Sequence, residues 1–172
     1  MNNAGIDYMF TGALAASYYG LPRTTMDIDI VVKVTEENIL TFAAQLRKAG
    51  IQANEQNIHK AFKSDYRIIT LEDKKTPFSI DIILSDKKLE KKPGMILGLP
   101  TFYQTPEALI LSKLRMIKVT VPKERTLKDK DDVRAILKYT KINMKALKRR
   151  ARIENTISIL EELTRAKDSP FS

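Results

Sequence analysis

The chain has 172 residues, 43% hydrophobic and 30% charged, and its 30 Lys and Arg outweigh 21 Asp and Glu to give a formal charge of +9. This length suits one domain with room for a small appendage. With no Cys and one His, the sequence excludes disulfide scaffolds, zinc ribbons, iron–sulfur clusters and thiol catalysis. Any bound metal should therefore be a hard ion held by carboxylates, such as Mg²⁺ or Mn²⁺.

The amino terminus has no basic segment followed by a sustained apolar one, so we expect no signal peptide. No stretch approaches the ~18 apolar residues that a membrane helix needs. We therefore expect a cytoplasmic protein that does not enter a membrane.

The first part of the chain alternates between strand and helix patterns. The expected elements are a strand over 7–11, a helix over 13–19 ended by Gly20, a strand over 26–34, a helix over 35–49 ended by Gly50, and two strands over 66–72 and 78–84. The last two are joined by a polar turn over 73–77 and predict an antiparallel hairpin. A charged loop over 86–92 and one or two short strands over 95–103 complete this part.

From Thr105 onward the pattern is helical. Thr105, Pro106 and Glu107 are a typical helix start, with an N-cap, a proline at the first position and an early acid. The expected helices cover 108–117, 129–139, and 143–167 as one long or two short elements. We therefore predict an α+β protein, with a mixed β-sheet flanked by helices over 1–104 and a basic helical region over 105–172.

The positive charge is concentrated in the second part. Residues 113–152 hold 15 basic and four acidic side chains, a net charge of +11, whereas the remainder has a net charge of −2. A solvated helix surface is one interpretation, and a surface that faces a polyanion such as RNA is the other.

Three aspartates on predicted strands are the candidate metal-binding and catalytic residues. Because side chains alternate along a strand, Asp27 and Asp29 lie on one face, ~6–7 Å apart, while Ile28 and Ile30 face the core. Asp81 lies between isoleucines in a later strand, and if the two strands are neighbours it lies ~4.5–5.5 Å from one of the pair. Solvent-facing acids are the alternative, but a divalent cation would turn the repulsion between such carboxylates into coordination.

Gly12 precedes a predicted helix of small residues. A glycine there lets backbone approach a phosphate closely, and the N–H groups that open the helix form an anion site. Together with the three aspartates, this indicates two-metal phosphoryl transfer.

The spacing of these residues resembles the signature of the polymerase-β-like nucleotidyltransferase superfamily. The signature here is Gly12-Ala13, thirteen residues, then Asp27-Ile28-Asp29, with Asp81 on a later strand. Residues 23–29 are similar to the form in small bacterial and archaeal members, which include toxin–antitoxin nucleotidyltransferases. Residues 105–114 and 128–132 resemble the helices that follow the core in those members.

The resemblance implies a nucleotidyltransferase fold and the transfer of a nucleotide from an NTP to an acceptor hydroxyl, with release of pyrophosphate. It implies Asp27 and Asp29 as ligands shared by two Mg²⁺ ions, and Asp81 as a ligand of the catalytic ion that helps to deprotonate the acceptor. Gly12 and Ala13 would hold the triphosphate. The family usually has Gly or Ser at position 13, so Ala13 lacks a hydroxyl contact and predicts weaker nucleotide binding.

Three further residues are candidates for nucleotide binding, each with a structural alternative. Arg23 would clamp a phosphate or pair with a loop acid. Thr25 would contact the nucleotide or favour the strand. Lys113 matches a basic residue that the family often has near the phosphates, and its alternative is a surface lysine.

Other polar residues favour structural roles. The acids and bases of 128–132 predict helix capping and salt bridges rather than a second metal site, and His59 is expected at the surface. The basic side chains of 145–152 suit an RNA backbone, without the aromatic residues that would indicate base stacking. The alternatives to catalysis are a fold kept as a module that binds RNA or a partner protein, and one half of a toxin–antitoxin pair.

Overall fold

In the computed structural model, which describes residues 5–72 and 77–165, a six-stranded mixed sheet has the order β3-β4-β2-β1-β6-β5. The strands are β1 (Tyr8–Phe10), β2 (Asp27–Lys33), β3 (Ile68–Glu72), β4 (Ser79–Ser85), β5 (Lys91–Ile96) and β6 (Leu99–Gln104). Strand β2 pairs antiparallel with β1 and parallel with β4, while the predicted β3–β4 hairpin is confirmed as an antiparallel pair. Most of the turn predicted between β3 and β4, and the last two residues of the helix predicted to reach 167, lie outside the described residues.

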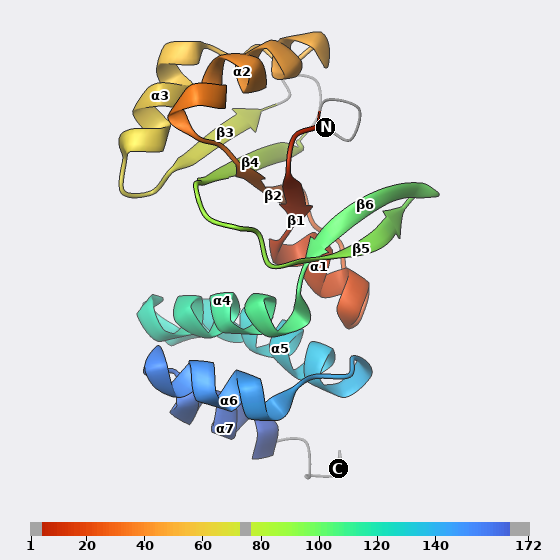
Figure 1. Cartoon of the computed structure of the whole chain (residues 1–172). Helices are drawn as coiled ribbons and strands as arrows, with labels where there is room; N and C mark the ends of the chain where they lie inside the picture. The colour runs from red at the N-terminus through yellow and green to blue at the C-terminus, as the bar shows by residue number, and fades with distance from the viewer. Residues whose placement is uncertain (1–4, 73–76, 166–172) are drawn as a thin grey trace. The chain divides into compact units, whose positions relative to one another are not determined.

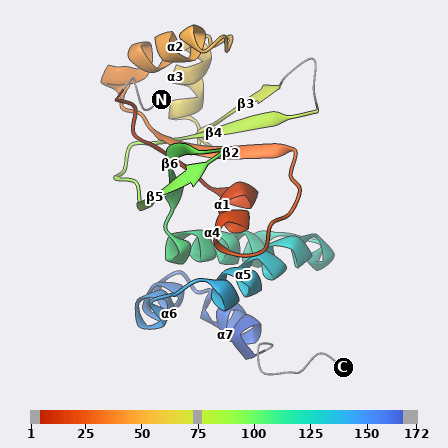
Figure 2. The ribbon, with the colours of Figure 1, turned by 90° about the vertical axis from the view of Figure 1, so that its right-hand side faces the viewer.

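Two helices, α2 (Ile39–Lys48) and α3 (Glu55–Lys63), cover one face of this sheet (Figures 1 and 2). A one-turn 3₁₀ segment, η2 (Glu36–Asn38), precedes α2, and its start is stabilised by the Thr35 N–H, which donates to the Asn38 side chain at 2.8 Å. Beneath the helices, Ile30, Val32 and Ile82 of the sheet pack against apolar residues that include Phe42 and Ile58. The even-numbered residues of β2 and β4 therefore face the core, as the alternation predicts.

Helix α3 is an element that the sequence patterns did not predict. It begins at the N-cap Asn54, whose side chain accepts a hydrogen bond from the Gln56 N–H at 2.8 Å. It has nine residues, of which only Ile58 and Phe62 are buried, so its apolar stripe is too short to indicate a helix in the sequence. Its stability comes from packing on α2 and the sheet.

The prediction of a charged loop over 86–92 is wrong at its C-terminal end, because Lys91 and Lys92 already belong to β5. Lysines and Pro93 are poor strand formers, so the sequence does not indicate a strand there. Strand β5 is at the edge of the sheet, where a proline is tolerated, and its pairing with β6 decides its conformation.

The remaining helices are α1 (Gly12–Tyr19), α4 (Pro106–Val119), α5 (Leu127–Tyr139), α6 (Met144–Ile153) and α7 (Ile157–Arg165), with a 3₁₀ turn η3 (Lys123–Thr126) before α5. The predicted helix start at Thr105 and Pro106 is confirmed. The predicted segment 143–167 forms two helices, because Asn155 adopts a left-handed conformation, φ +54°, and ends α6. No helix among the described residues has the length and apolar composition to span a bilayer.

Contacts divide the chain into a sheet unit (Met1–Thr11 and Thr25–Gln104) and a helical unit (Gly12–Thr24 and Thr105–Ser172). The predicted division after residue 104 differs from this grouping at Gly12–Thr24, because α1 packs with the C-terminal helices. The backbone at the end of α1 lies very close to α5, since a Cβ on Gly20 would lie 2.9 Å from the Ala135 Cβ.

Candidate functional site

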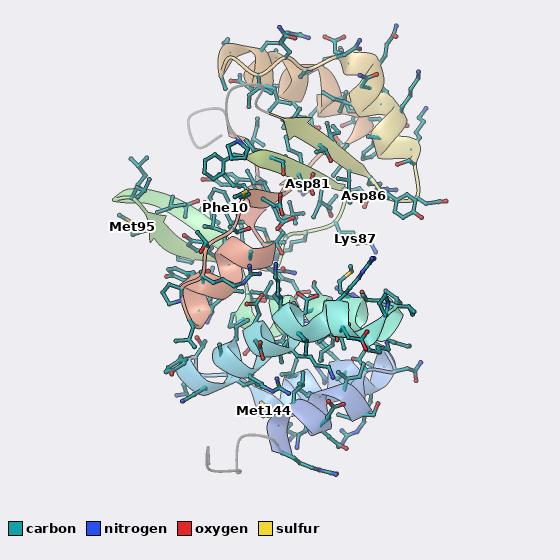
Figure 3. All side chains as sticks on the ribbon, turned by 180° about the vertical axis from the view of Figure 1, so that it is seen from behind. Phe10, Asp81, Asp86, Lys87, Met95 and Met144 are labelled. Atoms are coloured by element: carbon teal, nitrogen blue, oxygen red, sulfur yellow. The ribbon has the colours of Figure 1, made fainter. Side chains whose placement is uncertain are left out.

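The three predicted aspartates lie on one face of the sheet unit, opposite to the face covered by α2 and α3. In the parallel register of β2 and β4, Asp29 is the direct partner of Asp81, and Asp27 is the partner of Ser79. Register partners on neighbouring strands have backbones ~4.8 Å apart. Figure 3 labels Asp81 on β4 and Asp86 just beyond the end of that strand. The two strands are therefore neighbours, which is the condition on which the expected proximity of Asp81 to the pair depended, and Asp29 and Asp81 lie side by side on them.

Two hydroxyl groups that the sequence patterns did not single out contact these carboxylates. The Ser79 hydroxyl donates to Asp27 Oδ1 at 2.8 Å, and the Thr70 hydroxyl donates to Asp81 Oδ1 at 2.7 Å. Each hydrogen bond uses one of the two oxygens of its carboxylate. Ser79 lies two residues before Asp81 and therefore on the same face of the strand, so its place near the aspartates could be inferred from the sequence. The place of Thr70 could not, because it depends on the register of β3 against β4.

Thr25 lies immediately before β2 in the sheet unit. Its hydroxyl donates to the Asp27 carbonyl at 3.1 Å and accepts from the Asp27 N–H at 3.2 Å. These bonds hold the backbone where strand β2 begins, and contact between Thr25 and a nucleotide stays a prediction.

In the helical unit, Gly12 and Ala13 open α1. Gly12 has φ +58°, a left-handed conformation that a residue with a side chain adopts only at a cost. The side chain of Ala13 is buried. The first N–H groups of this eight-residue helix have no partner within the helix, as in anion-binding helix starts.

Arg23 and Lys113 meet at one buried carboxylate of the helical unit. The Arg23 guanidinium pairs with Asp132 of α5 through two bonds, Nε to Oδ1 at 2.9 Å and Nη2 to Oδ2 at 3.0 Å. Lys113 of α4 lies 2.7 Å from Asp132 Oδ2 and 2.9 Å from Asp129 Oδ1. We call Arg23, Lys113, Asp129 and Asp132 the ion-pair cluster.

This cluster limits the structural alternatives for Lys113 and Arg23. The side chain of Lys113 is 7% exposed, so it is not a surface lysine. Arg23 pairs with an acid of a helix rather than of a loop, and remains 31% exposed. The salt-bridging role predicted for residues 128–132 is confirmed for Asp129 and Asp132.

The pKa of Asp132 is below the ordinary value for an aspartate. Burial alone would raise this pKa, but hydrogen bonds and charge from Arg23 and Lys113 outweigh it. Asp132 is therefore ionised at neutral pH, and it holds both cations in place.

Several solved structures have a similar fold. The antibiotic-resistance factor ANT(2'')-Ia in solution has a TM-score of 0.64 at 16% identity, over 96% of this chain and 91% of that one. Its crystal structure in complex with adenylyl-2''-tobramycin has a TM-score of 0.63 at 16% identity, over 90% and 91%. An antigenic nucleotidyltransferase-like protein from Paracoccidioides brasiliensis has a TM-score of 0.55 at 16% identity, over 80% and 70%.

The chain has a nucleotidyltransferase fold. No protein-family model and no curated protein sequence matches it. At this identity the similarity establishes the fold.

Within this nucleotidyltransferase fold the predicted site residues fall into two groups. Asp27, Asp29 and Asp81 lie in the sheet unit with Thr25, while Gly12, Ala13, Arg23 and Lys113 lie in the helical unit. His59 is half-buried on α3 and is not among either group.

The carboxylates fit a hard divalent ion by their chemistry, because oxygen donors on one face of neighbouring strands are what such an ion takes. Across residues 5–72 and 77–165, however, no three His, Asp or Glu side chains are gathered closely enough to form a metal site as they stand. The hydrogen bonds from Ser79 and Thr70 hold Asp27 and Asp81 toward their own strand neighbours.

A hollow of about 460 Å³ lies elsewhere in the sheet unit, where α2 meets α3. Arg47, Asn54 and Asn57 are among its lining residues, and Arg47 is paired with Glu55 at 3.0 Å. None of the predicted site residues is among those that line it. The face of the sheet that carries Asp27, Asp29 and Asp81 therefore remains the candidate active site.

Proposed function

We propose that this protein is a metal-dependent nucleotidyltransferase that transfers NMP from an NTP to an acceptor hydroxyl. The observation that carries the proposal is the register of β2 against β4, which sets Asp29 directly opposite Asp81 with Asp27 two residues along. Like charges directly opposite each other destabilise a sheet. A divalent cation that binds both carboxylates during function would turn this repulsion into coordination.

Asp27, Asp29 and Asp81 would hold Mg²⁺ or Mn²⁺ at this face. When bound, these ions supply positive charge that offsets the charge of the phosphates and of the attacking oxygen.

The chain's own residues then bind and orient the reactants. The N–H groups after Gly12 bind phosphate oxygens, and Arg23, at the exposed side of the ion-pair cluster, meets a further phosphate. Lys113 is too buried for this contact and acts as a positioning residue, because it shares Asp132 with Arg23. Asp81 accepts the proton of the acceptor hydroxyl. The acceptor oxygen forms a bond to the α-phosphorus, the bond from this phosphorus to the bridging oxygen breaks, and pyrophosphate leaves.

The test uses the full chain with each of the four α-labelled NTPs, Mg²⁺, and either total RNA or total protein as the acceptor. We expect label transfer with at least one NTP, and a loss of at least 100-fold in Asp27→Asn and Asp81→Asn, since charge neutralisation at the reacting phosphate supplies several kcal/mol. Asp65→Asn is the matched control, because Asp65 is an exposed acid of the same unit outside the strands. Transfer that survives in the two site variants would contradict the proposal.

NTP binding separates a catalyst from an inert module with the same fold. We expect Mg²⁺-dependent binding of an NTP by the wild-type chain in calorimetry, and weaker binding by Arg23→Ala. If no NTP binds with or without Mg²⁺, the protein is a binding module rather than an enzyme.

A further inference from the structure

Helix α6 carries a row of exposed positive charge. Lys145, Arg149 and Arg152 are exposed and follow the i, i+4, i+7 spacing of a single helix face. We call these three residues the α6 stripe; Met144, labelled in Figure 3, is the first residue of the helix that bears it. Exposed Lys141 precedes the helix and half-buried Lys148 lies beside the stripe. Helix α6 contains no acidic residue.

Other basic side chains of the helical unit are already engaged. Arg115 pairs with Glu154 at 2.7 Å, Lys130 with Glu162 at 3.1 Å and Arg134 with Asp131 at 3.0 Å. By contrast, no residue of the α6 stripe forms an ion pair with an acid in the described part of the chain. The stripe therefore keeps its charge available for a partner.

The helix is held rigidly from its other side. Leu147 and Ala151 are fully buried, and Asn143 caps the helix by accepting from the Ala146 N–H at 3.0 Å. The apolar face is thus used within the helical unit, so α6 cannot insert it into a lipid surface. A fixed row of cations suits a partner with regularly spaced negative charge.

We propose that the α6 stripe binds the phosphate backbone of an RNA duplex, which makes a structured RNA the acceptor class. The substrate role rests on the proposed nucleotidyltransferase function, but the binding itself does not. From Lys145 to Arg152 the helix advances ~10 Å, a length over which a nucleic-acid duplex carries about six phosphates. The helix has no aromatic side chain, which favours backbone contact over base stacking. RNA also presents the terminal hydroxyls that the transfer reaction needs.

The stripe argues against the acceptor type of one structural neighbour. ANT(2'')-Ia was solved in complex with adenylyl-2''-tobramycin, which contains a cationic aminoglycoside. A helix with five basic and no acidic residues repels such a molecule and attracts a polyanion.

The experiment measures binding of a fluorescent RNA hairpin to the full chain by anisotropy, as a function of salt. The triple variant Lys145→Gln, Arg149→Gln, Arg152→Gln is compared with a control, Lys48→Gln, Lys60→Gln, Lys88→Gln, which removes the same charge from exposed positions of the sheet unit. Thermal unfolding checks that both variants fold.

We expect the stripe variant to bind at least 10-fold more weakly near 0.1 M salt and to lower the slope of log K against log salt by about three, since each lost phosphate contact removes ~0.9. The control should change affinity less than threefold. Equal losses in both variants would mean that only net charge matters, and would overturn the proposal. It would also fail if polyglutamate of equal charge, or a DNA hairpin of the same sequence, bound more tightly than the RNA.

The Asp27→Asn, Asp81→Asn double variant separates the two proposals. It should bind the hairpin as the wild type does, although it transfers no nucleotide. RNA binding without transfer by the wild type would refute the enzymatic function alone. Transfer to RNA whose KM is unchanged in the stripe variant would refute the role of α6 alone.

Discussion

Interactions between charged side chains distinguish the two groups of candidate site residues. Asp29 and Asp81 are register partners on adjacent strands and carry like charges. By contrast, Arg23 and Lys113 carry charges opposite to that of Asp132, with which both form ion pairs. The first arrangement places two like charges at neighbouring positions, which a bound cation would join, and the second supports the helical unit. The two groups therefore respond in opposite ways to neutralising a carboxylate.

Neutralising one member of the repelling pair should stabilise the sheet unit. In Asp81→Asn, the amide oxygen still accepts the Thr70 hydroxyl while the repulsion from Asp29 is removed. We expect a gain of about 0.5 kcal/mol in the free energy of unfolding without divalent ions. Mg²⁺ should raise the melting temperature of the wild type and leave that of the variant unchanged. A Mg²⁺ response of equal size in both proteins would argue against Asp81 as a ligand.

Neutralising Asp132 should do the reverse. Asp132→Asn removes the charge that balances Arg23, leaves Asp129 as the charged partner of the buried Lys113, and replaces one of the two oxygens that accept from Arg23 by an NH₂ group that cannot accept. Breaking a buried pair in this way costs about 3–5 kcal/mol of unfolding free energy, measurable by urea denaturation. Asp131→Asn is the neighbouring control, because that side chain is 72% exposed and its pair with Arg134 is worth less than about 1 kcal/mol. Similar losses in the two variants would show that the cluster adds nothing beyond a surface pair.

At the scale of elements, small residues allow two helices to approach closely. The backbone after α1 passes so near α5 that a Cβ on Gly20 would meet Ala135 at 2.9 Å and the Ala16 carbonyl oxygen at 3.1 Å. Gly20 was expected only to end the helix, which it does, with its N–H donating to Ala16 at 2.8 Å. Its second role, in packing, depends on which helix lies opposite.

This close approach predicts a specific pair of variants. Gly20→Ala should cost about 1–3 kcal/mol of unfolding free energy through overpacking. Adding Ala135→Gly, which removes the clashing methyl group, should restore part of that loss even though glycine itself weakens α5 by about 1 kcal/mol. Urea denaturation of the two single variants and the double variant measures the coupling. Strictly additive losses would contradict the contact.

At the scale of the whole molecule, stability should depend on pH through the ionised acids. The folded-state pKa of Asp132 is depressed, so its contribution is complete above the unfolded value of ~3.9 and is lost as pH falls through the lower folded value. Asp86, paired with Arg67, also has a lowered pKa, but it is exposed and contributes little.

We therefore expect the wild type to keep a constant free energy of unfolding between about pH 5 and 7, as far as Asp132 is concerned, and to lose stability below about pH 4. The Asp132→Asn variant should start less stable and show a shallower acid decline. Urea denaturation across this pH range measures both. An equally steep decline in the variant would assign the acid sensitivity to other carboxylates.

Features that depend on local order along the chain follow from the amino-acid sequence alone. Strand alternation placed Asp27 and Asp29 on one face, and the composition limited any metal to hard ions held by oxygen. The helix starts and ends at Thr105, Gly20 and Gly50 also followed from local chemistry.

Features that join residues distant in sequence depend on how the folded chain packs. The pairing of Asp29 with Asp81, the hydroxyl of Thr70 and the strand character of Lys91 all follow from the register between strands, which a single strand does not encode. Burial of Lys113 beside Asp132 likewise requires the packing of α4 on α5. Local patterns specify which groups a segment offers, but the free energy of burial and pairing, summed over the whole fold, selects which groups meet.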